Sequence, residues 1–171
     1  MRANKPEITT LEPQTVLTIT SVGDPNESER YFKALYGTAY STRFKVYKPA
    51  GQDMKFGKLM ARWPDAHLKP KDHWTGIWGL PVPTFVRQQD LVQKDAELPV
   101  KVEVWEYNEV AQVLYKGPYT EEGPTVTLLH NFIKASGYDI DGNSHEEVYL
   151  TSPDAVDQKT IIRYKIKKMK E

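Results

Sequence analysis

The segment VAQVLYKGPYTEEGPTVTLLHNFIKASG, residues 110–137, predicts a strand, a turn and a helix in direct succession. Val, Leu and Tyr dominate its first part, as is typical of a strand, and Gly117-Pro118 interrupts the run. Thr120 is a suitable cap for a following helix, and Gly137 favours its end. Apolar residues recur between them at helical spacing: Thr125, Leu128, Leu129, Phe132 and Ile133. The second half of the chain is therefore built around one amphipathic helix.

Further strands are predicted around this helix. A β-branched run precedes it, joined to the segment above at Asn108-Glu109. After the helix, one short strand ends at Ser152-Pro153-Asp154, and a last one alternates apolar and polar residues as a half-buried strand does. The predicted strands of this half are Val100–Tyr107, Val110–Lys116, His145–Leu150 and Thr160–Ile166.

The first half of the chain repeats this order. Asp24 is a good helix cap and Pro25 suits the first helical position, so a helix is predicted from Pro25 to about Tyr47. The strands predicted around it are Thr15–Thr20, Phe56–Trp63, Trp74–Gly79 and Thr84–Leu91. In both halves a Pro-Asp pair ends the strand that follows the helix, at Pro64-Asp65 and at Pro153-Asp154.

The matching order predicts an α+β fold made of a duplicated β-α-β-β unit, with antiparallel sheets and one long helix per repeat. The repeats cover residues 14–92 and 100–168, approximately, within a single domain of residues 1–171. We expect a ligand cleft between the repeats, because the seam between two similar units has two preformed walls.

The composition excludes several classes of protein. The 171 residues carry 23 Lys and Arg against 23 Asp and Glu, so the formal net charge is zero. A protein that binds nucleic acid through its phosphates needs an excess of positive charge, so this function is not expected. There is no Cys, so disulfides, thiolate metal sites and cysteine nucleophiles are absent. No apolar run is long enough to span a membrane, and the N-terminal residues do not resemble a signal peptide. We therefore expect a cytoplasmic protein that is not bound to a membrane.

The strand predicted at His145–Leu150 carries the most informative side chains. Because strand side chains alternate between faces, Val148 and Leu150 point one way, and we expect the helix to cover them. His145, Glu147 and Tyr149 then share the opposite face. That face is either a solvated surface or the floor of a ligand groove with Glu147 at its centre.

Aromatic residues are a second group of candidates. Trp74 and Trp78 lie in a glycine-containing extended stretch, and Tyr36 and Tyr40 lie one helical turn apart. Aromatic residues at helical spacing are usually part of the core. Alternatively, aromatic rings around one carboxylate form a receptor for an apolar cation, through cation–π attraction and ion pairing.

No metal or cofactor motif is found. His67 and His73 lie near acidic residues in a loop without the spacing of a metal site. Residues 139–143 resemble a calcium loop, but Leu150 occupies the position of its bidentate Glu. Phosphate-binding glycine loops and nucleophile elbows are also missing. We expect a small-molecule ligand, no cofactor and no metal, and nothing indicates a protein partner.

The sequence resembles the GyrI-like small-molecule-binding domain family. The resemblance is most specific in the second half, in VLYKGPY at 113–119, in Gly137-Tyr138 after the helix and in EVYLTSPD at 147–154. In the first half it depends on GDPN at 23–26, LYGTAY at 35–40 and GIW at 76–78. It implies the duplicated fold with a cleft between repeats, and an acidic residue in that cleft, which falls on Glu147.

The resemblance leaves three functions open. Some stand-alone members of the family are hydrolases that open the strained cyclopropane of DNA-alkylating natural products, others bind ligands, and one inhibits DNA gyrase. As a hydrolase, Glu147 would be a general base with Tyr149 or Tyr115 stabilising the developing oxyanion, and burial would raise the pKa of Glu147. As a binder, Glu147 would pair with a cationic drug. The apolar walls in either case are assigned to Trp78 and to Tyr36 or Tyr40, with Trp74 and His145 as further contacts. Nothing in the sequence favours the third function, a gyrase-inhibitor type of interaction module.

Overall fold

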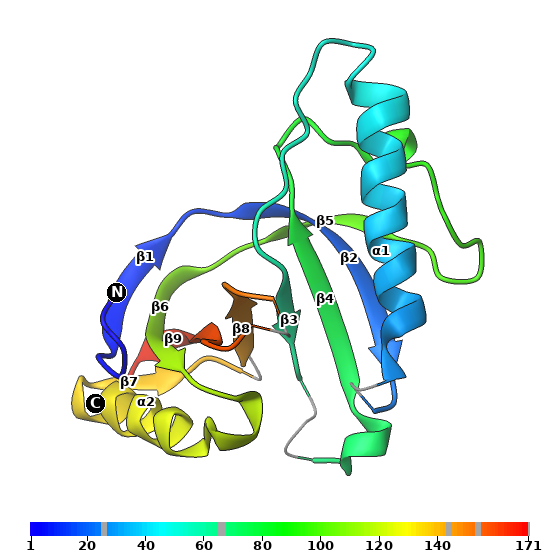
Figure 1. Cartoon of the computed structure of the whole chain (residues 1–171). Helices are drawn as coiled ribbons and strands as arrows, with labels where there is room; N and C mark the ends of the chain where they lie inside the picture. Colours follow the sequence, from blue (N-terminus) through cyan, green and yellow to red (C-terminus); the bar gives the residue numbers. More distant parts are fainter. Residues whose placement is uncertain (25–26, 65–67, 143–144, 153–154, 171) are drawn as a thin grey trace. The chain divides into compact units, whose positions relative to one another are not determined.

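The computed structural model describes residues 1–24, 27–64, 68–142, 145–152 and 155–170. The chain divides into two compact units. One unit is Pro13–Glu106, and the other combines Met1–Glu12 with Tyr107–Glu171 (Figure 1). The predicted α+β class with antiparallel sheets is confirmed in both.

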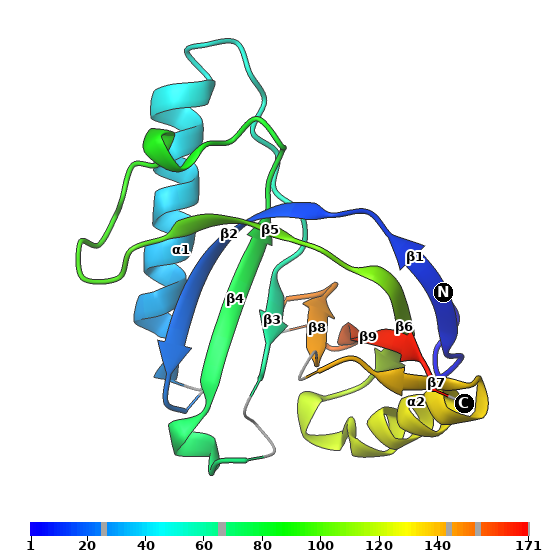
Figure 2. The same ribbon diagram turned by 180° about the vertical axis from the view of Figure 1, so that it is seen from behind.

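The unit Pro13–Glu106 holds an antiparallel sheet with the strand order β3-β4-β2-β5. Its strands are β2 (Gln14–Val22), β3 (Met60–Arg62), β4 (Thr75–Pro81) and β5 (Lys101–Trp105). Helix α1 (Glu29–Thr42) runs along this sheet, as Figure 2 shows from behind, and continues into a π-helical turn, Arg43–Tyr47. Short 3-10 turns lie at Lys71–His73 and Gln88–Asp90.

The other unit holds an antiparallel sheet with the strand order β1-β6-β9-β8. Its strands are β1 (Glu7–Leu11), β6 (Asn108–Lys116), β8 (Glu146–Tyr149) and β9 (Lys159–Lys168), and β7 (Tyr138–Ile140) pairs with the far end of β9. A 3-10 turn, Tyr119–Glu121, leads to helix α2 (Gly123–Ala135). Eight buried residues of α2, β6 and β9 form its core: Ala111, Val113, Tyr115, Leu129, Ile133, Ile162, Tyr164 and Ile166.

The predicted duplication is visible in the order of the elements. One unit has β2-α1-β3-β4, and the other has β6-α2-β8-β9, with β7 added after its helix. The strand that precedes each repeat in the sequence pairs with a strand of the other repeat. Strand β1, which precedes the first repeat, pairs with β6, and β5, which precedes the second, pairs with β2. Each sheet is therefore completed by a strand that comes from outside its own β-α-β-β segment.

Several predicted boundaries differ from the structure. Thr84–Leu91 is not a strand, and only Met60–Arg62 of the predicted strand Phe56–Trp63 is regular. The regular part of the first helix begins at Glu29. Further expectations fall on Pro25, Asn26, Asp65, His67, Asn143, Pro153 and Asp154, which lie outside the described residues. Within the described part of the chain, no helix is long and apolar enough to cross a membrane.

The face of β8 that α2 covers is the opposite of the predicted one. Glu147 pairs with Ile162, whose side chain belongs to the core under α2, and directly paired residues project to the same face. Glu147 therefore lies on the α2 side, and Val148 lies on the other side. The prediction that Val148 and Leu150 lie under the helix was wrong because both faces of β8 are buried, so polarity alone does not identify the helix side.

The face of β8 and β9 opposite to α2 holds a buried ion pair. Arg163 Nη1 lies 2.8 Å from Oε2 of Glu146, whose side chain is only 2% exposed. The Tyr107 hydroxyl donates to the other Glu146 oxygen at 3.0 Å, and Arg163 Nε donates to Gln112 Oε1 at 3.0 Å. Buried charges require such compensation, so this network is a structural element of the sheet.

Candidate functional site

The side chains of His145, Glu147 and Tyr149 meet on one face of β8, as the alternation of the strand predicts. Glu147 is 6% exposed and accepts two hydrogen bonds from this strand. Its Oε1 lies 3.1 Å from His145 Nε2, and its Oε2 accepts from the Tyr149 hydroxyl at 3.1 Å. Glu147 is thus a buried carboxylate held between an imidazole and a phenol.

Tyr164 of β9 fixes the orientation of His145. The Tyr164 hydroxyl lies 2.6 Å from His145 Nδ1, and the two rings meet edge to face with centroids 5.1 Å apart. Burial raises the pKa of Tyr164, and the negative charges of Glu122 and Glu147 raise it further, so the phenol keeps its proton. In the arrangement that satisfies every donor, Tyr164 donates to Nδ1 and Nε2–H donates to Glu147.

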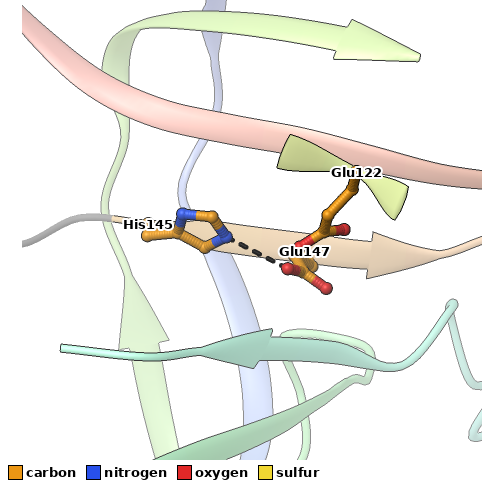
Figure 3. Close-up of side chains that lie close together, drawn as sticks. All are labelled: Glu122, His145 and Glu147. Carbon is orange, nitrogen blue, oxygen red and sulfur yellow. Dashed lines mark hydrogen bonds and ion pairs between the residues drawn. The ribbon is translucent and has the colours of Figure 1, made fainter. Parts of the chain in front are cut away.

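Glu122 places a second carboxyl beside Glu147. It directly precedes α2 and makes no side-chain cap hydrogen bond to that helix. Figure 3 shows its carboxyl group directed at Glu147, with His145 on the far side of Glu147. Burial raises the pKa of Glu122 to about 9, and the charge of Glu147 and a hydrogen bond between the two carboxyls act in the same direction. We call Glu122 and Glu147 the carboxyl pair.

The pKa of Glu147 moves in the opposite direction to the one expected from the sequence. Burial alone would raise it, but the hydrogen bonds that Glu147 accepts from His145, Glu122 and Tyr149, together with the positive charge of His145, outweigh burial and lower the pKa. The expectation was wrong because it considered the loss of water without the donors that replace it. The pKa values of the two carboxyls therefore move apart, upward for Glu122 and downward for Glu147.

The same atoms are spaced closely enough to meet one metal ion. Ligand atoms of Glu122, His145 and Glu147 all lie within 4.8 Å of one another. The hydrogen bond between His145 Nε2 and Glu147 Oε1, 3.1 Å long, already accounts for one of these contacts. We therefore interpret the cluster as a proton-sharing network.

The predicted tryptophan positions lie in the unit Pro13–Glu106. Trp78 is 5% exposed, donates Nε1–H to Ser21 Oγ at 2.9 Å and meets Phe32 of α1 edge to face. Trp74 donates to the Lys69 carbonyl at 2.8 Å. Both tryptophans contact the ring of Trp63, at centroid distances of 5.8 Å for Trp74 and 5.2 Å for Trp78. Trp78 therefore occupies the core between α1 and its sheet.

The predicted tyrosines have different surroundings. Tyr40 is 46% exposed and stacks near Phe44, whereas Tyr36 is half-buried and burial raises its pKa. Tyr115 belongs to the core under α2 and donates its hydroxyl to the Pro118 carbonyl at 2.6 Å. The Tyr115 hydroxyl is therefore already used within the loop that connects β6 to α2.

Sequence reasoning missed Glu122 and Tyr164. The alternation of the last strand placed Tyr164 on one face with Ile162 and Ile166, and pairing with β8 then brings it to His145. Glu122 had no comparable pattern, because it is one of two adjacent glutamates in a loop. Only the turn into α2 selects it over Glu121, which is exposed.

Comparisons with known proteins agree with the fold. A model of the GyrI-like small molecule binding domain matches residues 4–167. A hydrolase from Listeria innocua is 23% identical, with a TM-score of 0.82 over 98% of this chain and 94% of its own. An uncharacterized conserved protein from Listeria innocua is 26% identical, with a TM-score of 0.81 over 96% and 93%. The C-terminal domain of EcmrR is 14% identical, with a TM-score of 0.69 over 96% and 98%. No curated protein matches the sequence.

Proposed function

The chain belongs to the GyrI-like small-molecule-binding family, and on this premise we propose that it binds hydrophobic or cationic drug-like molecules at the Glu147 carboxylate. The observation that supports this site is the buried carboxylate of Glu147, which is oriented by His145 and Tyr149 and has no Lys or Arg among the hydrogen-bond partners that the described residues give it. A ligand with a positive charge on an apolar body would supply a permanent counter-charge and an apolar contact together.

We further propose that the site hydrolyses strained electrophiles such as cyclopropanoid alkylating agents. An ionised carboxylate whose two oxygens are held by donors is suited to accept a proton from water as that water attacks carbon. Tyr149 donates to Glu147, so its role in this proposal is to position the base. A positioned base contributes on the order of a hundred- to ten-thousand-fold in rate, which is sufficient for an electrophile that is already strained.

The binding proposal is tested with two ligands that differ in charge but share one aromatic body. Crystal violet is a cation, and its leuco form is neutral at pH above 7. We expect Glu147→Gln to weaken crystal violet binding by about ten- to a hundredfold, because a charged hydrogen-bonded contact is lost, and to leave the leuco form within about twofold. The matched control is Glu121→Gln, an exposed glutamate of the same loop as Glu122.

Isothermal titration calorimetry measures both affinities. Equal affinity of the wild type and Glu147→Gln for crystal violet would refute the binding site. The hydrolysis proposal has its own test: loss of the dienone absorbance of a spirocyclopropyl cyclohexadienone, which we expect from the wild type and not from Glu147→Gln. A wild type that binds crystal violet through Glu147 but leaves the dienone unchanged is a binder and not a hydrolase of this class.

A further inference from the structure

We propose that Glu122 is the proton donor of the site: it holds a proton at neutral pH and delivers it to an oxygen of the ligand, while Glu147 stays ionised as the base. The inference depends on the proposed function for its ligand chemistry, but the position of the proton is a separate claim. It assigns two different roles to two carboxyls that lie side by side.

The hydrogen-bond donors are distributed unequally between the two carboxyls. One oxygen of Glu147 is hydrogen-bonded to His145 Nε2, and the other accepts a hydrogen bond from the Tyr149 hydroxyl. Glu122 Oε2 is buried, and no donor of the described residues reaches it. An ionised carboxylate needs donors, whereas a protonated one supplies its own. The geometry therefore favours the charge on Glu147 and the proton on Glu122.

The ionisable groups around Glu122 do not reverse this assignment. Glu147 and Tyr149 lie on β8, and His145 directly precedes this strand. Tyr115 lies on β6, Tyr164 on β9 and His130 on α2, and Glu121 is next in the chain. Burial lowers the pKa of His130, whose Nε2 has no partner among the described residues, so this ring is not a counter-charge. Burial raises the pKa of both Tyr115 and Tyr164, so neither phenol is a charged neighbour at neutral pH.

One effect opposes the proposal, namely the dipole of α2. A carboxylate at a helix N-terminus is stabilised, and Glu122 directly precedes this helix. However, the Glu122 side chain makes no capping hydrogen bond and is directed at Glu147. The dipole favours a nearby negative charge only modestly, and the close like charge of Glu147 opposes a second buried carboxylate more strongly.

A donor beside a base defines the class of substrate. The substrate has an electrophilic carbon whose departing electron pair passes through a conjugated system to a carbonyl oxygen, as in a cyclopropane fused to a dienone. Water forms a bond to the ring CH2 and gives a proton to Glu147. The strained C–C bond breaks, its electron pair moves to the carbonyl oxygen, and that oxygen takes the proton of Glu122. The product is a phenol with a hydroxyalkyl group, so all atoms of water and substrate are accounted for.

Contact between the two carboxyls also restores the starting state. After the reaction Glu147 carries the proton and Glu122 is ionised, which reverses the resting arrangement. Because oxygen atoms of the two groups lie within 4.8 Å of each other, one proton transfer between the neighbouring carboxyls restores both. The pair therefore needs no net exchange of protons with bulk water between turnovers.

Two measurements test the proposal on the full-length protein. The first is infrared spectroscopy of the carbonyl stretch of protonated carboxylic acids at about pH 7. We expect a band in the wild type and in Glu121→Gln that is missing from Glu122→Gln and disappears in the wild type as pH passes about 9. Absence of the band from the wild type, or its persistence in Glu122→Gln, would overturn the proposal.

The second measurement is the rate of dienone loss with the spirocyclopropyl cyclohexadienone. We expect Glu122→Gln to lower kcat by a hundredfold or more and to remove the alkaline limb of the pH profile, with Glu121→Gln unchanged. An infrared band with an unchanged kcat in Glu122→Gln would refute the donor role. If the wild type itself leaves the dienone intact, hydrolysis fails as a function, and the infrared result alone decides where the proton lies.

Discussion

Replacing Glu122 by Gln is expected to make the protein more stable, and increasingly so as pH rises. Burial, the charge of Glu147 and their mutual hydrogen bond raise the pKa of Glu122 from 4.5 to about 9. Between these two values the folded protein keeps a proton that the unfolded chain releases. Stability contributed by this group is therefore complete below pH 4.5 and is lost progressively as pH rises toward 9. Gln is neutral at every pH and does not incur this loss.

The size of the effect follows from the width of that interval. Roughly 2.5 pH units separate the reference value of 4.5 from neutral pH, and each unit corresponds to about 1.4 kcal/mol. The upper limit at pH 7 is therefore about 3.5 kcal/mol. Part of the shift belongs to Glu147, because the two groups titrate together, so we expect Glu122→Gln to gain about 1–3 kcal/mol at pH 7.

The assay is urea unfolding followed by far-UV circular dichroism at about pH 5, 7 and 8.5. The difference between Glu122→Gln and wild type should be near zero at the lowest pH and should grow toward the highest. The pKa of Glu147 is lowered, so the loss of stability with rising pH comes from the group whose pKa is raised. Glu121→Gln should follow the wild type throughout. A difference that is constant with pH, or a variant that is less stable at pH 8.5, would refute the assignment of the proton.

Three other expectations concern stability and metal binding. Arg163→Met should destabilise the fold by about 3–5 kcal/mol in urea unfolding, because Glu146 stays buried without its cation. Adding Glu146→Leu should recover most of that lost stability. A double variant that is no more stable than Arg163→Met would contradict this. Gly79→Ala should lower the stability by about 1–3 kcal/mol in the same assay, because the new Cβ would lie 2.5 Å from the Trp105 ring; an unchanged midpoint would show that the ring can move. A tenfold excess of Zn²⁺ should leave the melting temperature of the wild type unchanged in differential scanning fluorimetry, because the carboxyl pair already holds a proton. A rise in melting temperature that Glu147→Gln abolishes would identify a metal centre instead.

The order of the elements could be predicted from the sequence because it depends on local patterns. Apolar residues at helical spacing located α2, which the structure has at Gly123–Ala135. Alternation located the last strand, which is longer than predicted, at Lys159–Lys168. Thr84–Leu91 was assigned incorrectly because extended residues form a strand only when a partner strand supplies hydrogen bonds. The exchange of leading strands between the sheets has no local pattern, so only the structure reveals it.

The candidate site was predicted in part. The alternation of one strand correctly grouped His145, Glu147 and Tyr149, because a period of two is fixed by backbone geometry. Which face the helix covers is a matter of tertiary packing, and it was assigned to the wrong side. Glu122 comes to Glu147 across 25 residues of chain, through the turn that begins α2. A contact at that separation leaves no trace in spacing or composition.

Glu146 and Glu147 illustrate why burial alone does not identify a functional carboxylate. The two are adjacent in the chain, and both are almost completely buried. Glu146 faces the guanidinium of Arg163 at 2.8 Å, so its charge is cancelled and nothing is left for a ligand to balance. The partners of Glu147 are an imidazole, a phenol and a second carboxyl that retains its proton, so its negative charge persists. A ligand cation or a water proton can respond only to a charge of the second kind, and this difference is why we propose Glu147 as the functional carboxylate.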